Sequence, residues 1–355
     1  MSAGSSPSLR ASPGRPPRTW LLLGDKPGDN AQVLVLAGAL GWPCETRTAR
    51  VKPEWLQRKP RVRASLAHVD ATRSDRLDPP WPELVITVGR RLSSVALWIQ
   101  RESLGATKLV LIGKPRQHAR RFDLLVVSSQ YRLGRRANSV RIRLPLIRID
   151  RAALAEAAHR WQPRFAGFRR PLLALLVGGP TRATRLDTDV ARALAMQASD
   201  LCTEAGGSLY VCTSRRTPPA VVEALESALP ARTPLYRWRA DDPENPYLAL
   251  LGLAERFAVT SDSVTMMVEV ARLGRPLAIA RLPAQRSWLR RLTRSRDLDA
   301  VARQLIDASL AVELGQPWRA PAAPADDDLD AVVARIRALF SLPAGAEAEA
   351  TRSTK

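Results

Sequence analysis

Short apolar runs alternate with segments of helical spacing through the first half of the chain. The runs that indicate strands lie at residues 19–23, 44–51, 83–88, 108–112 and 124–127, and three of them end at a glycine. Helical spacing covers residues 31–40, with Asp29 or Asn30 expected as the N-cap, and residues 91–103. Buried strands separated by helices are typical of a parallel sheet that is covered on both faces.

The same pattern starts again after an interruption at residues 152–170, which begin with helical spacing and then contain Pro163 and Gly167. Strands are predicted at 172–177, 208–213, 235–238, 257–260 and 276–280. Helices are predicted at 187–205, 219–229, 246–255, 263–273 and 327–339. We therefore predict an α/β protein with two Rossmann-like, doubly wound domains.

This pattern divides the chain into five predicted parts. They are a disordered basic tail (1–18), an N-terminal Rossmann-like domain (19–160), a linker (161–170), a C-terminal Rossmann-like domain (171–318), and a spacer with a terminal helix and tail (319–355). The first residues lack the apolar region of a signal peptide. No apolar run approaches the roughly 20 residues that a membrane span needs, so we expect a cytoplasmic protein without a transmembrane helix.

The composition limits which kinds of disulfide, metal and cofactor sites we expect in this protein. The three cysteines are unevenly spaced and form no CxxC motif, and the chain has three histidines. These numbers predict a reducing compartment, no disulfide framework and no metal site. We also expect no tightly bound cofactor.

The net charge of +21 is concentrated in the first half. Residues 1–165 carry 30 Lys and Arg against 12 Asp and Glu, whereas residues 166–355 carry 25 against 22. A genomic preference for arginine explains why six of the 55 basic residues are lysine, but it does not explain the imbalance in one half. We expect an anionic partner such as a membrane surface or a lipid phosphate, with a place on the inner face of the membrane. We do not expect nucleic acid as a partner, because the sequence has no recognised nucleic-acid-binding motif.

Ligands of open α/β sheets bind beyond the carboxyl ends of the strands, so the loops there hold the candidate residues. The first loop, residues 25–32, lacks both the GxGxxG spacing and the GK[ST] of a phosphate loop. A plain turn between strand and helix explains it equally well. As an acceptor loop it would use Pro27, Gly28, Asn30 and Gln32.

Two loops of the second half favour a phosphate ligand. Gly178 and Gly179 precede Thr181, and free backbone amides at such a turn suit a phosphate. Residues 213–218 combine hydroxyls with guanidinium groups, which match phosphate geometry, in Ser214, Arg215 and Arg216. The alternative for this loop is a capped helix with exposed arginines.

The segment from Thr260 to Pro276 is the strongest candidate. A strand ends in hydroxyls and an acid where a helix begins, and Glu269 follows deeper in that helix. Helix amides with a hydroxyl would hold a phosphate, and the carboxylate would accept sugar hydroxyls. The residues concerned are Ser261, Asp262, Ser263, Thr265 and Glu269, joined by Asn245 at the start of the preceding helix. The alternative is a capped helix with a surface acid, and Asn245 as an N-cap.

Strand, hydroxyl loop, helix with glutamate, then Gly-x-Pro and strand resembles the donor half of GT-B glycosyltransferases. In particular, it is similar to the lipid-intermediate N-acetylglucosaminyltransferase of peptidoglycan synthesis. The resemblance implies two Rossmann-like domains facing a cleft, with a nucleotide sugar, UDP- or similar, as substrate. It also implies that Glu269 holds the ribose and that residues 263–265 lie near the diphosphate.

A second resemblance covers residues 19–310. The motifs DKPGDNAQ (25–32), GGPT (178–181), TSRRTP (213–218), NPY (245–247) and TSDSVTMMVEV (260–270) are similar to the mitochondrial-fission family named for elongated plant mitochondria. Bacterial members are common, and this Ala- and Arg-rich composition suggests one. Plant members imply a peripheral role on a membrane, so the resemblance leaves open a non-catalytic adaptor.

The chain departs from that family at one strand end. Members usually carry Pro-x-His-Asp there, where this chain has Ser128-Ser129-Gln130-Tyr131. Asp25, Asp29 and His118 then remain as candidate bases. We predict a glycosyltransferase-like protein that binds a nucleotide sugar and acts on an envelope or lipid-linked saccharide at the membrane surface, with the non-catalytic membrane adaptor as the alternative.

Overall fold

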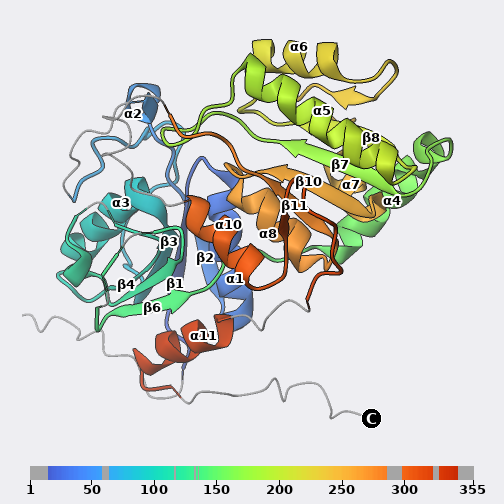
Figure 1. The fold of residues 1–355 in the computed structure, drawn as a ribbon. Helices are drawn as coiled ribbons and strands as arrows, with labels where there is room; N and C mark the ends of the chain where they lie inside the picture. The colour runs from blue at the N-terminus through green and yellow to red at the C-terminus, as the bar shows by residue number, and fades with distance from the viewer. Residues whose placement is uncertain are drawn as a thin grey trace, which may run out of the picture. The chain divides into compact units, whose positions relative to one another are not determined.

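The chain folds into two compact units, which Figure 1 shows as a ribbon. Unit 1 comprises Met1–Leu146 with Asp327–Lys355, and unit 2 comprises Ile147–Asp326. This computed structural model describes residues 15–57, 64–115, 117–131, 133–134, 136–285, 298–322 and 328–342. Of the predicted tail at 1–18, residues 1–14 lie outside the described residues, as do the residues from 343 onward. Arg18, predicted to belong to the tail, instead donates its backbone N–H to Glu83 at 2.9 Å.

Unit 1 is built on a six-stranded parallel sheet in the order β2-β1-β3-β4-β5-β6. Its strands are β1 (Thr19–Leu23), β2 (Cys44–Thr48), β3 (Leu84–Val88), β4 (Lys108–Ile112), β5 (Leu124–Ser128) and β6 (Ser139–Ile142). Its helices are α1 (Pro27–Leu40), α2 (Pro53–Gln57), α3 (Gly89–Glu102), the short 3-10 helix η1 (Ala119–Arg121) and α11 (Leu329–Ala338). One apolar core packs α1 and α11 on the sheet and another packs α3 on it, so helices cover both faces.

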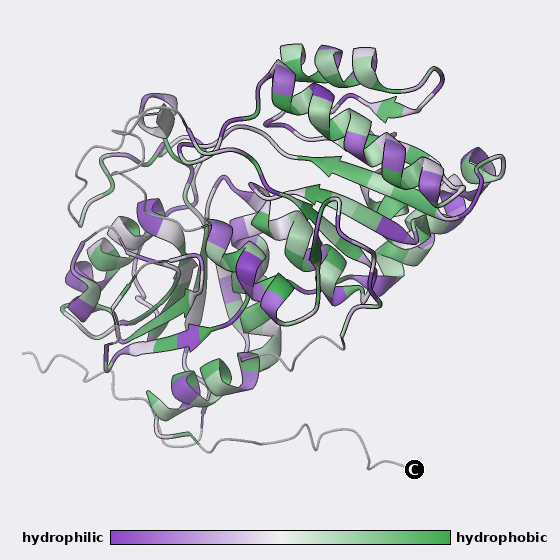
Figure 2. Ribbon diagram, in the orientation of Figure 1, coloured by the Kyte–Doolittle hydropathy of each residue, from purple (hydrophilic) through white to green (hydrophobic). Residues whose placement is uncertain are grey.

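Unit 2 repeats this plan with a parallel sheet in the order β12-β11-β10-β7-β8-β9. Its strands are β7 (Leu172–Val177), β8 (Ser208–Thr213), β9 (Leu235–Tyr236), β10 (Arg256–Thr260), β11 (Leu277–Ala280) and β12 (Val312–Glu313). Its helices are α4 (Arg151–Phe165), α5 (Thr188–Glu204), α6 (Pro219–Ala228), α7 (Tyr247–Leu253), α8 (Val264–Arg272) and α10 (Leu298–Asp307). Figure 2 shows the central strands as continuous apolar stretches between helices of mixed polarity, as the sequence predicted.

The start of α1 differs from the prediction. The helix begins at Pro27 with Lys26 as its N-cap, not with Asp29 or Asn30. Proline fits the first helical position because the N–H that it lacks has no intrahelical partner there. Asn30 lies inside the helix and uses its side-chain amide on the backbone of Gly24, accepting from its N–H and donating to its carbonyl, both at 2.9 Å.

The unit boundary also differs from the predicted domains. We placed a boundary at residue 160 and a linker at 161–170, but α4 runs past residue 160 into the first half of that linker and packs on α7 of unit 2. The two helices approach closely at Gly252, where an added Cβ would lie 3.0 Å from the Cβ of Ala158. Proline at position 163 does not end α4. The predicted terminal helix forms as α11, and it completes unit 1.

None of the helices in the described ranges is both long and apolar enough to cross a membrane. The structure also adds elements that the sequence pattern did not indicate. They are α2, within a stretch expected to be irregular, the 3-10 helix η1, the edge strands β6 and β12, and helix α10.

Candidate functional site

The candidate site of unit 2 lies where the order of its sheet reverses. From β7 the chain moves to β8 and β9 on one side, and then returns to β10 on the other side of β7. The loops after β7 and β10 therefore diverge at the same sheet edge, the position where open α/β sheets bind ligands. Figure 1 shows α5 and α6 above these strands and α8 below them.

Asp262, just after β10, joins three loops at this edge. Its side chain is fully buried, and Oδ2 accepts the backbone N–H of Gly179 at 2.9 Å. The same oxygen pairs with the Arg216 guanidinium at 2.6 Å, and 40% of the Arg216 side chain is exposed. Asp262 Oδ1 is also buried, and it has no hydrogen-bond partner in the described part of the chain. The carboxylate thus fixes a half-exposed arginine at the carboxyl ends of β7, β8 and β10.

Gly178 and Gly179 allow these loops to meet. A Cβ on Gly178 would lie 2.2 Å from Asp262 Oδ2, and one on Gly179 would lie 2.0 Å from the Arg216 carbonyl oxygen. Their amides donate to Thr260 Oγ1 at 2.8 Å and to Asp262. The sequence predicted free amides for a phosphate at this turn, and that prediction is wrong, because both amides hold the loops together.

The loop after β8 is anchored by Thr217, which the sequence did not single out. Its hydroxyl donates to the Gly178 carbonyl at 2.6 Å and accepts the N–H of Ser214 at 2.9 Å. Ser214 Oγ in turn accepts the N–H of Arg216 at 3.3 Å. Arg215 is exposed beside them. The Thr-Pro pair before a helix was the available signal for Thr217, but the Gly178 carbonyl that it contacts comes from another loop.

Thr181 and Ser261 have structural partners. Thr181 Oγ1 accepts the N–H groups of Ala183 and Thr184, at 3.1 and 3.0 Å, and so closes its own turn. Ser261 is buried, and its hydroxyl accepts the N–H of Leu282 at 3.0 Å. These two predicted ligand groups therefore shape the loops around the site.

Helix α8 begins beside Asp262 without a side-chain cap in the described structure. Its N-cap is Ser263, and the first amides of an α-helix have no partner within the helix. Such amides, together with the positive end of the helix dipole, attract anions. Thr265 is exposed in this first turn.

Glu269 lies one turn after Thr265 on the same face of α8 and contacts the start of α7. The Tyr247 hydroxyl donates to Glu269 Oε2. Burial raises the pKa of the Glu269 carboxyl, and the hydrogen bond from Tyr247 opposes that rise. Burial and the nearby carboxylate also raise the pKa of Tyr247 well above its ordinary value. Asn245 accepts the N–H of Tyr247 at 3.0 Å and so positions this tyrosine.

The candidate bases of unit 1 lie in different settings. Asp25 accepts the N–H of Val51 at 3.0 Å and lies 3.7 Å from the Arg50 guanidinium. Asp29, in the first turn of α1, lies 3.8 Å from the Lys26 ammonium, and 24% of its side chain is exposed. His118 is exposed at the start of η1, in the loop after β4.

The predicted acceptor loop is the first part of α1. Pro27 and Gly28 are exposed in its first turn, whereas Gln32 is buried. Asn30 is already hydrogen-bonded to the Gly24 backbone. Exposed backbone at the helix start is therefore what this segment offers a ligand.

The segment Ser128–Tyr131 forms a packed turn at the end of β5. Gln130 donates to Ser128 Oγ at 3.1 Å, and Ser129 donates to the Arg143 carbonyl at 2.9 Å. Tyr131 is buried against Gly113, where an added Cβ would lie 3.2 Å from its hydroxyl oxygen. Neutral side chains thus occupy the strand end where the resembling family usually has histidine and aspartate.

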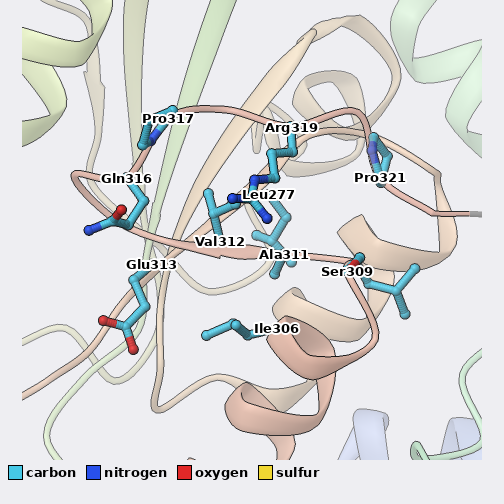
Figure 3. A pocket seen from close by; sticks show the side chains of 11 residues that line it. Leu277, Ile306, Ser309, Ala311, Val312, Glu313, Gln316, Pro317, Arg319 and Pro321 are labelled. Carbon is cyan, nitrogen blue, oxygen red and sulfur yellow. The ribbon is translucent and has the colours of Figure 1, made fainter.

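A cavity of about 290 Å³ lies elsewhere in unit 2, at the amino ends of β11 and β12 (Figure 3). Leu277, Ile306 and Val312 contribute apolar surface, and Glu313 and Arg319 are the charged groups on its wall. None of the predicted site residues lines this cavity.

A family model described as Mitochondrial fission ELM1 matches residues 27–338. An Arabidopsis thaliana protein named mitochondrial fission protein ELM1 is 29% identical over 220 residues, which are 56% of this chain and 51% of that protein. The chain thus spans about half the length of this plant relative. An uncharacterized protein of Rickettsia prowazekii is 23% identical over 294 residues, 73% of this chain and 82% of the relative.

Three solved structures are also similar to this chain. MurG of Acinetobacter baumannii has a TM-score of 0.44 at 15% identity, covering 84% of this chain and 85% of its own. The Methanocaldococcus jannaschii UDP-GlcNAc 2-epimerase has a TM-score of 0.48 at 11% identity, covering 91% and 99%. MnaA of S. aureus, solved with UDP, has a TM-score of 0.49 at 10% identity, covering 93% and 98%. With TM-scores below 0.5, these similarities identify no function for the chain.

Proposed function

The chain belongs to the family described as Mitochondrial fission ELM1, and from this premise we propose that its unit 2 binds a nucleotide sugar at the carboxyl edge of β7, β8 and β10. The observation that carries the proposal is the pair formed by Asp262 and Arg216. A buried carboxylate holds the guanidinium in place, while part of that guanidinium stays accessible. A fixed arginine suits a phosphate because its N–H groups match two phosphate oxygens.

Local charge supports an anionic ligand at this place. Asp262 is negative, but Arg216 neutralises it at 2.6 Å, and Arg215 adds a further exposed positive charge. The uncapped start of α8 adds the equivalent of about half a positive charge. The balance therefore favours a diphosphate between the loop after β8 and the first turn of α8.

The sugar side of the ligand would lie along α8. Thr265 and Glu269 share one face of this helix, so a ligand whose phosphates meet the first turn extends towards the Glu269 carboxylate. An ionised carboxylate accepts hydrogen bonds from hydroxyl groups and has no hydrogen of its own to donate. This complements the ribose of a nucleotide.

Transfer of the sugar would require a base to deprotonate the acceptor hydroxyl. The acceptor oxygen then bonds to the anomeric carbon, and the nucleoside diphosphate leaves, stabilised by Arg216 and the α8 amides. The three candidate bases from the sequence, Asp25, Asp29 and His118, all belong to unit 1, and Asp25 already accepts the N–H of Val51. The proposed acceptor is an envelope or lipid-linked saccharide, and the excess of basic residues in the first half would favour an anionic membrane surface.

A non-catalytic adaptor is the second candidate function. It is favoured by the turn at Ser128–Tyr131, whose polar side chains are used in internal hydrogen bonds and whose tyrosine is buried. Such a protein would bind the nucleotide sugar without turning it over. It would also float with vesicles that contain anionic lipid.

Calorimetry with UDP-, GDP- and CMP-sugars tests the proposal, after a thermal-shift screen that uses stabilisation by bound ligand. We expect one class of nucleotide sugar to bind. Arg216→Lys should weaken that affinity roughly tenfold, since lysine keeps the positive charge but lacks the planar guanidinium that pairs with two phosphate oxygens. Arg192→Lys is the control, because Arg192 pairs with Asp189 on the exposed surface of α5. Failure of every nucleotide sugar to bind would refute the proposal, and binding without turnover would favour the adaptor.

A further inference from the structure

Tyr247 and Glu269 form a hydrogen-bonded pair between two helices of unit 2. Tyr247 is the first residue of α7, and Glu269 lies in the second turn of α8. The phenol hydroxyl donates to Oε2, and Tyr247 is the one hydrogen-bond partner of this carboxylate among the described residues. The backbone of Tyr247 is itself fixed by Asn245. The pair is therefore built from an anchored tyrosine and a partly buried acid.

The pair can still accept hydrogen bonds, but its one hydroxyl hydrogen is already used. A tyrosine hydroxyl has one hydrogen, and here it is used on Glu269 Oε2. What remains is Oε1 of the carboxylate and the lone pairs of the phenol oxygen, all of which are acceptors. Adjacent acceptors suit a ligand with two neighbouring hydroxyl groups, each of which donates one hydrogen bond.

The position of the pair suits the ribose of the proposed ligand. Glu269 follows Val264, the first residue of α8, by five residues, which corresponds to about 7–8 Å along the helix axis. This length is comparable to the distance from a 5′-phosphate to the 2′- and 3′-hydroxyls of a nucleotide. A diphosphate at the start of α8 would therefore bring the ribose diol to the level of Glu269.

We infer that Tyr247 is a positioning residue that selects ribonucleotides, because it holds the Glu269 carboxylate with Oε1 turned to the ribose diol. This inference rests on the proposed function. The tyrosine hydroxyl fixes one carboxylate oxygen, so the other keeps a single orientation. Without the hydroxyl, the carboxylate would rotate and would pair less well with the diol.

The test measures Kd by calorimetry for UDP, GDP and ADP and for their 2′-deoxy counterparts. For the tightest binder, we expect the wild-type protein to prefer the ribonucleotide roughly tenfold. Tyr247→Phe should remove most of this preference, because the ribonucleotide loses more affinity than its 2′-deoxy counterpart. Tyr236→Phe is the matched control, because the Tyr236 hydroxyl likewise donates to a carboxylate, that of Asp242 at 3.0 Å.

The outcomes separate this inference from the proposed function. If no nucleoside diphosphate or nucleotide sugar binds the wild-type protein, both fail. If nucleotides bind and Tyr247→Phe keeps the full preference for ribose while Glu269→Gln loses it, the role of Tyr247 is wrong and the proposed function stands. A generally damaged fold would weaken ribo- and deoxyribonucleotides alike, so an unchanged ratio counts against the inference.

A measurement on the unmodified protein covers the case in which Tyr247→Phe does not fold. The wild-type affinity for the 2′-deoxy- and 3′-deoxynucleotides is compared with that for the ribonucleotide. Loss of either hydroxyl should weaken binding severalfold, because each donates one hydrogen bond to the pair. Equal affinities for all three nucleotides would overturn the inference.

Discussion

The Asp262 carboxylate lies where the loops after β7, β8 and β10 meet. It is fully buried, whereas its partner Arg216 keeps 40% of its side chain exposed. This asymmetry determines which residue of the pair is more sensitive to removal of the other. An arginine that loses its partner can be solvated by water, but a buried carboxylate that loses its cation cannot.

Arg216→Ala should therefore lower the free energy of unfolding by about 2–3 kcal/mol, because it leaves the buried Asp262 charge without its cation. Urea denaturation followed by circular dichroism measures the loss. Arg192→Ala is the control: it removes an exposed pair with Asp189 at 3.2 Å, and should cost less than about 0.5 kcal/mol. The double change Arg216→Ala with Asp262→Asn should recover part of the loss. Equal effects of the two arginine changes would contradict the assigned coupling.

Glu269 gives ligand binding a pH dependence. Burial raises the pKa of this carboxyl, so the group stays protonated to a higher pH than an exposed glutamate. The ionised form is the better acceptor for sugar hydroxyls. Affinity for the nucleotide sugar should therefore increase as pH rises through the raised pKa and then level off. Tyr247 stays protonated over this range, since its own pKa is raised well above the ordinary value.

Calorimetry from acidic to neutral pH checks this direction, and Glu269→Gln is the control because its amide does not titrate. Titration of the ligand itself appears in both proteins and cancels in the comparison. Identical pH profiles for the two proteins would show that Glu269 does not contact the ligand.

At the scale of elements, the glycine-containing loops show why the contacts within the site could not be predicted from the sequence alone. Gly178 lies 82 residues from Thr260, to which its amide donates, and Gly179 lies 83 residues from Asp262. A sequence pattern marks the glycines but does not show which loop approaches them. The same applies to Tyr247 and Glu269, which lie on different helices.

Gly179→Ala should destabilise the protein by roughly 1–3 kcal/mol, because the new Cβ would lie 2.0 Å from the Arg216 carbonyl oxygen and the loops would have to move. Gly38→Ala is the matched control. Gly38 lies within α1 with no atom within 4 Å of an added Cβ, so alanine should stabilise by up to about 1 kcal/mol. Thermal unfolding of both variants measures the difference. A neutral Gly179→Ala would mean that the loops are not closely packed.

Continuous apolar runs such as residues 172–177 and 108–112 allowed the strands, and with them the parallel α/β plan, to be predicted from the sequence. Residues 172–177 and 109–112 are buried throughout, and burial is what the pattern encodes. Of the four edge strands, β2 and β9 were predicted. The other two were missed because they are short and partly exposed: β6 reads Ser-Val-Arg-Ile and β12 has two residues. The start of α1 was misplaced because an asparagine suits both an N-cap and a bond to a neighbouring loop.

At the scale of the whole molecule, the path of the chain explains why the sequence did not assign the terminal helix to the N-terminal domain. Unit 1 is completed by α11, about 180 residues after the chain has left it at Leu146. Sequence reading assumes that neighbours along the chain fold together, and α11 does not follow that rule. Its contacts are with α1, β5 and β6.

Ile336→Ala should destabilise unit 1 by about 2–4 kcal/mol, because Ile336 is fully buried in the core that α11 shares with α1. Leu34→Ala is the control, since Leu34 lies on the exposed face of α1. Hydrogen exchange should localise the effect. Exchange in α1 and β6 should accelerate, since sub-global opening follows cooperative units, while α5 and α6 of unit 2 keep their protection. Uniform acceleration across both units would mean that α11 does not stabilise unit 1 specifically.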